Sequence, residues 1–84
     1  MHEILFTFQN THQALKAEKY LKNMNHRVKL IPTPFEIFSE CGFSLLVYLT
    51  EEDHEEISKN KTVNSVDCYV IIKEGDRNIA YEKI

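Results

Sequence analysis

In this 84-residue chain, the residue types best suited to a reactive site are a cysteine followed by a glycine, Cys41-Gly42. A thiolate is a strong nucleophile, and it is favoured beside a helix N-terminus or a cation. Glycine has no side chain, so a partner molecule can approach the neighbouring sulfur closely. Cys41 is therefore predicted to be a functional thiol. The alternative is a half-buried cysteine that packs like a small hydrophobic residue.

The second cysteine, Cys68, has a different setting. It alternates with Val66, Val70 and Ile72 along one face of an expected strand, which predicts a position in the core. The spacing of the two cysteines matches no pattern of zinc ligands. We therefore expect neither a metal nor a cofactor, and we expect both thiols to be reduced.

Thr11 and His12 open the first expected helix and are candidates to act on Cys41. Free N–H groups at a helix start stabilise an anion, and either side chain could add a hydrogen bond. His12 is expected to orient or protonate the thiol; its alternative is an exposed helix residue. The remaining histidines are interpreted as surface residues: His2, His26 and His54.

The pattern of apolar residues predicts the elements that would position these groups. Strands are expected at residues 3–8, 27–31, 43–49, 66–73 and 78–82, and helices at 12–24 and from the cap Thr50 to residue 60. In the second helix Ile57 is the strong apolar anchor. The buried stripe of the first helix is expected to comprise Ala14, Ala17, Tyr20, Leu21 and Met24.

This order of elements predicts an α+β fold: a ferredoxin-like βαββαβ antiparallel sheet with two helices on one face and an additional C-terminal edge strand. The first two strands then run in the same direction, joined by a right-handed crossover. The start of the first helix and the loop 32–42 should therefore lie at one edge of the sheet. Pro32 and Pro34 should stiffen that loop, and the third strand, apolar on both faces, should be central.

Composition predicts a single domain over residues 1–84, with 43% hydrophobic and 27% charged residues. A net charge of −3 argues against nucleic acid, and the strand of Tyr48 contains no Lys or Arg beside this aromatic residue. No signal peptide or membrane span is apparent, so we expect a cytoplasmic location and no membrane partner. The basic run 16–29 and the acidic run 51–56 are interpreted as solvated helix faces.

Three short motifs resemble the family of Se/S carrier protein-like domains: Thr11-His12, Ile31-Pro32-Thr33-Pro34 and Ser39-Glu40-Cys41-Gly42. The resemblance covers roughly residues 4–49. It implies a carrier, rather than a complete enzyme, that holds a persulfide or selenopersulfide on Cys41. Sulfur or selenium donor and acceptor proteins would be its partners. The implied binding loop comprises Pro32, Pro34, Ser39 and Gly42.

The chain departs from the expected family pattern in two places. Glu40 stands beside the cysteine where a small neutral residue is usual, and the region after residue 50 has a polar helix and an extra strand. The extra strand predicts a homodimer through edge strands. Two alternatives to the carrier stay open. One is a non-catalytic protein-interaction module in which Cys41 is structural. The other is a sensor of a small anionic ligand at the first helix.

Overall fold

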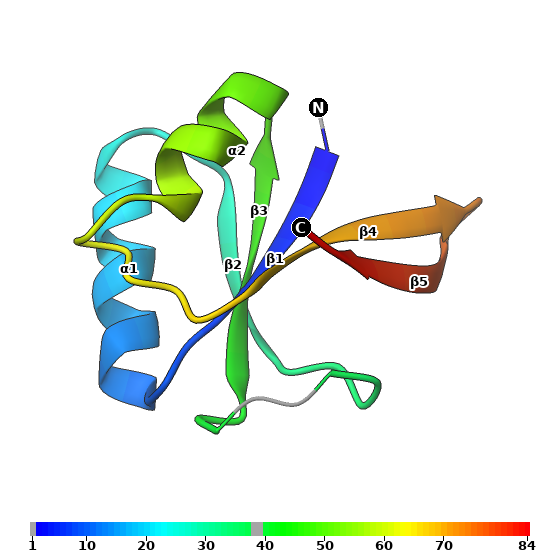
Figure 1. Cartoon of the computed structure of the whole chain (residues 1–84), viewed down its shortest axis with the longest axis horizontal. Helices are drawn as coiled ribbons and strands as arrows, with labels where there is room; N and C mark the ends of the chain where they lie inside the picture. The colour runs from blue at the N-terminus through cyan, green and yellow to red at the C-terminus, as the bar shows by residue number, and fades with distance from the viewer. Residues whose placement is uncertain (1, 38–39) are drawn as a thin grey trace.

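The computed structural model describes residues 2–37 and 40–84. Its elements follow the order β1 (His2–Thr7), α1 (Thr11–Asn23), β2 (Val28–Pro32), β3 (Phe43–Leu49), α2 (Glu51–Ser58), β4 (Cys68–Glu74) and β5 (Arg77–Lys83). The strands form one antiparallel sheet in the order β2-β3-β1-β4-β5 (Figure 1). This is the predicted α+β, ferredoxin-like arrangement, with β5 as the additional C-terminal edge strand.

β1 is the central strand of the sheet, and both of its faces are buried. Ile4, Phe6 and Phe8 belong to the core beneath the helices, whereas Leu5 belongs to a second cluster on the opposite face. These four side chains are at most 1% exposed. β3, which the sequence predicted to be central, is an interior strand between β1 and β2.

α1 begins where the sequence predicted it. The Asn10 side chain caps the helix by accepting the N–H of Gln13 at 2.8 Å, as is usual for asparagine at this position. The inner face of the helix is fully buried against the sheet at Ala14, Ala17 and Leu21. Two alanines among these three residues let the helix backbone approach the strands closely.

The prediction that Met24 continues this buried stripe is wrong. The side chain is 52% exposed, because α1 ends at Asn23 and Met24 is its C-cap. The chain then turns away from the helix axis at Asn25, whose φ is +65°. A stripe with helical spacing is therefore buried only as far as the helix itself continues.

α2 is short and touches the core through a single buried residue, Ile57, as the sequence predicted. Thr50 caps it by accepting the N–H of Asp53 at 3.2 Å. Within the described ranges, no helix is both long enough and apolar enough to cross a membrane. Because α2 has only eight residues, it covers only part of the sheet beside α1 (Figure 1).

The face of the sheet without helices is partly covered by the loop between β2 and β3. Ile37 of this loop packs with Leu5 and Ile71, and all three are at most 9% exposed. A hydrogen bond from the Ile37 N–H to the Pro34 carbonyl, 3.0 Å long, holds the turn that precedes it. The loop is therefore anchored to the sheet by a buried side chain.

The strand registers bring several segments to one edge of the sheet. Thr7 at the end of β1 lies opposite Ser44, and Pro32 at the end of β2 lies opposite Phe43. The segment before β4 joins them, since the Val66 N–H donates to the Thr7 carbonyl at 2.8 Å. We call this region, made of the described residues in 8–13, 32–44 and 62–67, the Cys41 edge.

Candidate functional site

The loop that carries Cys41 is closed at its base by two polar contacts. The Thr33 N–H donates to the Gly42 carbonyl at 2.9 Å. The Thr33 and Ser44 hydroxyl oxygens lie 2.7 Å apart, and Ser44 is fully buried. These contacts fix both ends of the loop to the start of β3, and Cys41 is therefore held at the edge of the sheet.

The Cys41 side chain is half-buried and packs against the core beneath the helices. Its thiol donates to the Phe43 carbonyl at 2.9 Å, and the Phe43 N–H donates to Sγ at 3.3 Å. Gly42 makes this turn possible with a φ of +75° in an open position, a conformation that other residues adopt only with strain. The sulfur is thus positioned by backbone groups two residues later in the chain.

Thr11 and His12 are the first two residues of α1, and both are exposed. The topology brings the start of α1 and the loop of Cys41 to the same edge of the sheet. Within the described residues, however, neither side chain makes a hydrogen bond to Cys41. Helical spacing places His12 on the side of α1 opposite the buried Ala14 and Ala17. Their roles toward the thiol therefore stay predictions.

The other residues of the predicted binding loop lie around this turn. Pro32 is the last residue of β2 and is exposed, and Pro34 is half-buried at the start of the turn that Ile37 anchors. Gly42 follows the thiol directly, and Ser39 lies outside the described residues. The structure thus places Pro32, Pro34 and Gly42 on the segment that carries Cys41.

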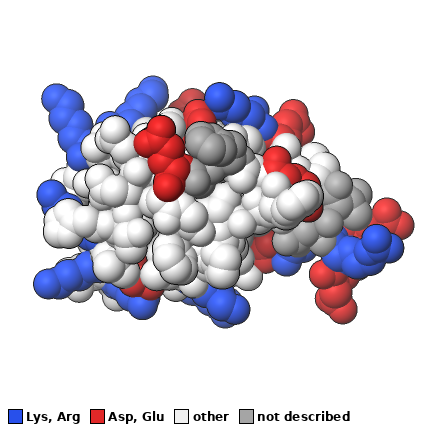
Figure 2. Space-filling view, turned by 90° about the horizontal axis from the view of Figure 1, so that it is seen from below, with Lys and Arg blue, Asp and Glu red and all other residues white. Residues whose placement is uncertain are grey.

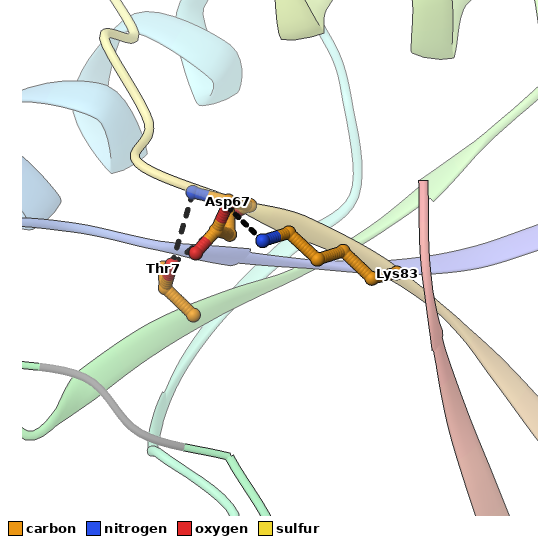
Figure 3. Close-up of polar contacts among 3 residues, drawn as sticks. All are labelled: Thr7, Asp67 and Lys83. Atoms are coloured by element: carbon orange, nitrogen blue, oxygen red, sulfur yellow. Dashed lines mark hydrogen bonds and ion pairs between the residues drawn. The ribbon is translucent and has the colours of Figure 1, made fainter.

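A buried hydroxyl fastens the other side of the Cys41 edge. Thr7 is 1% exposed, and its Oγ1 accepts the Asp67 N–H at 3.1 Å and donates to the Asp67 carbonyl at 3.3 Å. The Asp67 carboxylate in turn pairs with Lys83 of β5 at 3.1 Å (Figure 3). These contacts join the end of β1 to the start of β4 and to the C-terminal strand.

The described part of the Cys41 edge contains no Lys or Arg, and its charged residues are Glu36, Glu40 and Asp67. Figure 2 shows uncharged atoms across most of this view, with some acidic groups among them and the cations mainly around its margin. Three apolar side chains of the edge are exposed, Phe35 by 99%, Val66 by 59% and Phe43 by 39%. An exposed apolar surface of this kind favours contact with another protein.

Cys68 is buried in the core, as predicted, but the structure gives it a neighbour that sequence reasoning missed. Its Sγ lies 3.7 Å from Nε2 of His54. His54 is half-buried on α2, so its interpretation as a surface residue was wrong. Burial, and then the negative charge of Asp67, raise the pKa of the Cys68 thiol. Cys68 is therefore held in the protonated form, which is the less nucleophilic one.

Tyr48 has cationic neighbours that its own strand does not supply. The Arg27 guanidinium lies 5.2 Å from the centroid of its ring. The neighbouring Glu3 raises the pKa of the Tyr48 phenol, while Lys73 and Arg27 act in the opposite direction. Tyr48 therefore does have basic neighbours, but they come from outside its own strand, where the sequence argument did not look for them. The prediction that the chain does not bind nucleic acid remains untested.

Metal-ligating side chains do not converge in the part of the chain that the structure describes: no three His, Cys, Asp or Glu side chains there could hold an ion. The chemistry available at the Cys41 edge is therefore that of a thiol positioned by backbone groups.

Comparison with known proteins gives one match. The model of the family described as "Putative Se/S carrier protein-like" matches residues 3–84. No curated protein and no solved structure shows significant similarity to the chain. The match extends past residues 4–49 to include α2, β4 and β5. The family match therefore covers the C-terminal region as well, and the expected departures there, a polar helix and an extra strand, stay predictions.

Proposed function

Because the chain belongs to the Se/S carrier protein-like family, we propose that it carries a sulfur or selenium atom as a persulfide or selenopersulfide on Cys41. The observation that carries the proposal is the contrast between the two thiols. Cys41 is half-buried beside an open glycine at the end of the sheet, whereas Cys68 is 8% exposed and its pKa is raised by burial. A carrier needs one thiol that a donor can reach.

Loading of Cys41 is a thiol–persulfide exchange. The Cys41 sulfur attacks the outer sulfur of a donor persulfide, R–S–SH, and a new S–S bond forms while the S–S bond of the donor breaks. The Cys41 proton passes to the departing donor sulfur, which leaves as a thiol, so nothing is oxidised or reduced overall. Delivery to an acceptor thiol is the same exchange in reverse.

Backbone contacts hold the Cys41 sulfur in position for this exchange. Its thiol donates to the Phe43 carbonyl at 2.9 Å, and the Phe43 N–H donates to Sγ at 3.3 Å. The closure of the loop at Thr33 keeps Sγ in place without help from a partner. The exposed Phe35, Phe43 and Val66 give a donor or acceptor protein an apolar surface close to the sulfur.

Mass spectrometry after incubation with a small-molecule persulfide donor tests the proposal. The wild type and a Cys68→Ser variant should gain the mass of one sulfur atom, and a reducing agent should remove it. A Cys41→Ser variant should gain nothing. A donor with selenium as the transferred atom should give the corresponding selenium adduct. Equal loading of the Cys41→Ser variant would show that Cys41 is not the carrier.

A second candidate is a protein-interaction module in which Cys41 is structural. The 99% exposure of Phe35 at the turn of the loop favours it, because a large, fully exposed apolar side chain suits a binding surface. The same experiment separates the two functions. If Cys41 resists both the persulfide donor and a small alkylating agent in the folded protein, the interaction module is the better description.

A further inference from the structure

The helix side of the sheet is left open beside α2. A hollow of about 620 Å³ lies there, between α2, β1, β4 and the C-terminal end of β5. Val70 and Ile84 are among its apolar residues, and Glu51, Glu52, Glu55 and Glu82 are its acidic residues. Ile84 is 55% exposed. We call this feature the acidic hollow.

The negative charge of the acidic hollow is mostly unbalanced. Among the residues that the structure describes, Glu52, Glu55 and Glu82 form no ion pair. Glu51 has one contact, 3.9 Å from Nε2 of His2. Lys83 also lines the hollow, but its ammonium is paired with Asp67. A partner that fits this hollow should therefore combine cations with an apolar side chain.

The outward side of α1 has this combination. Leu15, Lys16 and Lys19 lie on the side of the helix away from the buried Ala14, Ala17 and Leu21. Leu15 is 46% exposed, and both lysines are exposed around it. Within the described residues neither of these lysines forms an ion pair, whereas Lys22 is paired with Glu18 at 3.3 Å. We call Leu15, Lys16 and Lys19 the basic stripe.

We propose that the chain forms a two-fold dimer in which the basic stripe of each copy packs into the acidic hollow of the other. The two surfaces have opposite charge, and each exposes apolar side chains that the contact would bury. Charge complementarity of this kind selects one partner and one orientation. The occupant of the acidic hollow is thus a second copy of this chain.

The positions of the two surfaces allow such a dimer to close. Both lie on the helix side of the sheet. α1 packs over β2 and β3 (Figure 1), whereas residues of β1, β4 and β5 line the acidic hollow. When two copies face each other about an axis parallel to the strands, each α1 lies opposite the hollow of its partner. Both contacts form together, and the assembly ends at two copies.

The surface required is within reach of a chain of this size. A stable interface buries about 800 Å² on each partner, and the accessible surface of the chain is 5714 Å². One outward helix face, the hollow and their rims would have to supply about one-seventh of it. The Cys41 edge is not part of this interface, so the dimer does not depend on the proposed sulfur chemistry.

Paired charge reversals test the dimer. One variant carries Lys16→Glu and Lys19→Glu, and the other carries Glu55→Lys and Glu82→Lys, which leaves the acids in the first turn of α2 in place. A control variant carries Lys29→Glu and Lys61→Glu, two exposed lysines outside both surfaces. The mass of each protein is measured by analytical ultracentrifugation over a wide range of concentration.

The wild type and the control should be dimers at high concentration, and each charge-reversed variant alone should be a monomer. An equimolar mixture of the two charge-reversed variants should dimerise again, because each acidic stripe then meets a basic hollow. This recovery also shows that both variants are folded. A monomeric wild type, a monomeric mixture or a ladder of larger assemblies would overturn the proposal. A dimer that both variants retain would overturn it in favour of pairing through edge strands.

Discussion

Replacing the buried Thr7 with valine tests how the end of β1 is tied to the start of β4. Valine has nearly the same shape, so the change replaces one hydroxyl with a methyl group and little else. The hydroxyl oxygen accepts the Asp67 N–H at 3.1 Å and donates to the Asp67 carbonyl at 3.3 Å. Both contacts are lost, while the backbone hydrogen bond from Thr7 to Asp67, 2.9 Å long, can remain.

The two lost contacts contribute unequally to the free energy of unfolding. The carbonyl of Asp67 keeps its bond to the Thr7 N–H, so the long contact to the hydroxyl adds little. The half-buried N–H of Asp67, by contrast, loses its acceptor, and an unsatisfied donor of this kind costs about 1–3 kcal/mol. Since the site is partly exposed, we expect a loss of about 1–2 kcal/mol. That loss lowers the melting temperature by about 4–16 °C in a chain of this size.

Urea denaturation measures the loss, and a Thr62→Val variant is the matched control. Thr62 is exposed, so its replacement should change the free energy of unfolding by less than about 0.5 kcal/mol. Amide exchange locates the effect: the Asp67 amide should exchange faster in the Thr7→Val protein, and the Val66 amide, bonded to the Thr7 carbonyl, should change less. Wild-type stability with unchanged exchange at Asp67 would refute the reasoning.

Two further substitutions probe the face of the sheet without helices. Burial alone would raise the pKa of Glu3, but Lys73 and Tyr48 outweigh it and lower the pKa below its ordinary value of 4.5. A Glu3→Gln variant should therefore lose about 1 kcal/mol at neutral pH. In pH-dependent unfolding, that deficit should vanish as the pH falls through the lowered pKa; a deficit that persists in acid contradicts this. Ile37→Ala should lower the free energy of unfolding by about 2–4 kcal/mol, whereas Phe35→Ala in the same loop should leave it nearly unchanged. Equal losses of stability in thermal unfolding would argue against Ile37 as the residue that anchors the loop.

The order of the elements was predictable because its signals are local. Asn10 and Thr50 each accept the N–H of the third residue after them, and a cap of this kind can be read from a few neighbouring letters. The alternation of Ile4, Phe6 and Phe8 fixes the strand and its inner face in the same way. The topology followed from this order of elements, which is why the loop of Cys41 and the start of α1 were expected at the same edge of the sheet.

The errors and omissions share a non-local cause. Met24 fits the spacing of a stripe whose helix has already ended. The contact between His54 and Cys68 joins α2 to β4, and no pattern along either segment marks it. Ile37 covers Leu5 only because the loop folds back across the sheet. At Cys41 the sequence indicated the thiol, but its two hydrogen bonds with the Phe43 backbone depend on the φ of Gly42, which the sequence alone does not fix.

The Cys41 edge and the acidic hollow lie at opposite ends of the same strands. Thr7 and Ser44 lie opposite each other at the Cys41 edge, and His2 and Leu49 lie opposite each other at the other end of the same pair of strands. Five steps along β3 at about 3.3 Å each separate these ends by about 16–17 Å. His2 lines the acidic hollow, so this half of the proposed contact lies away from the thiol, whereas the basic stripe lies further along α1 from the Cys41 edge. Neither surface contains a residue of the Cys41 edge, so the proposed dimer and the proposed carrier site use different residues.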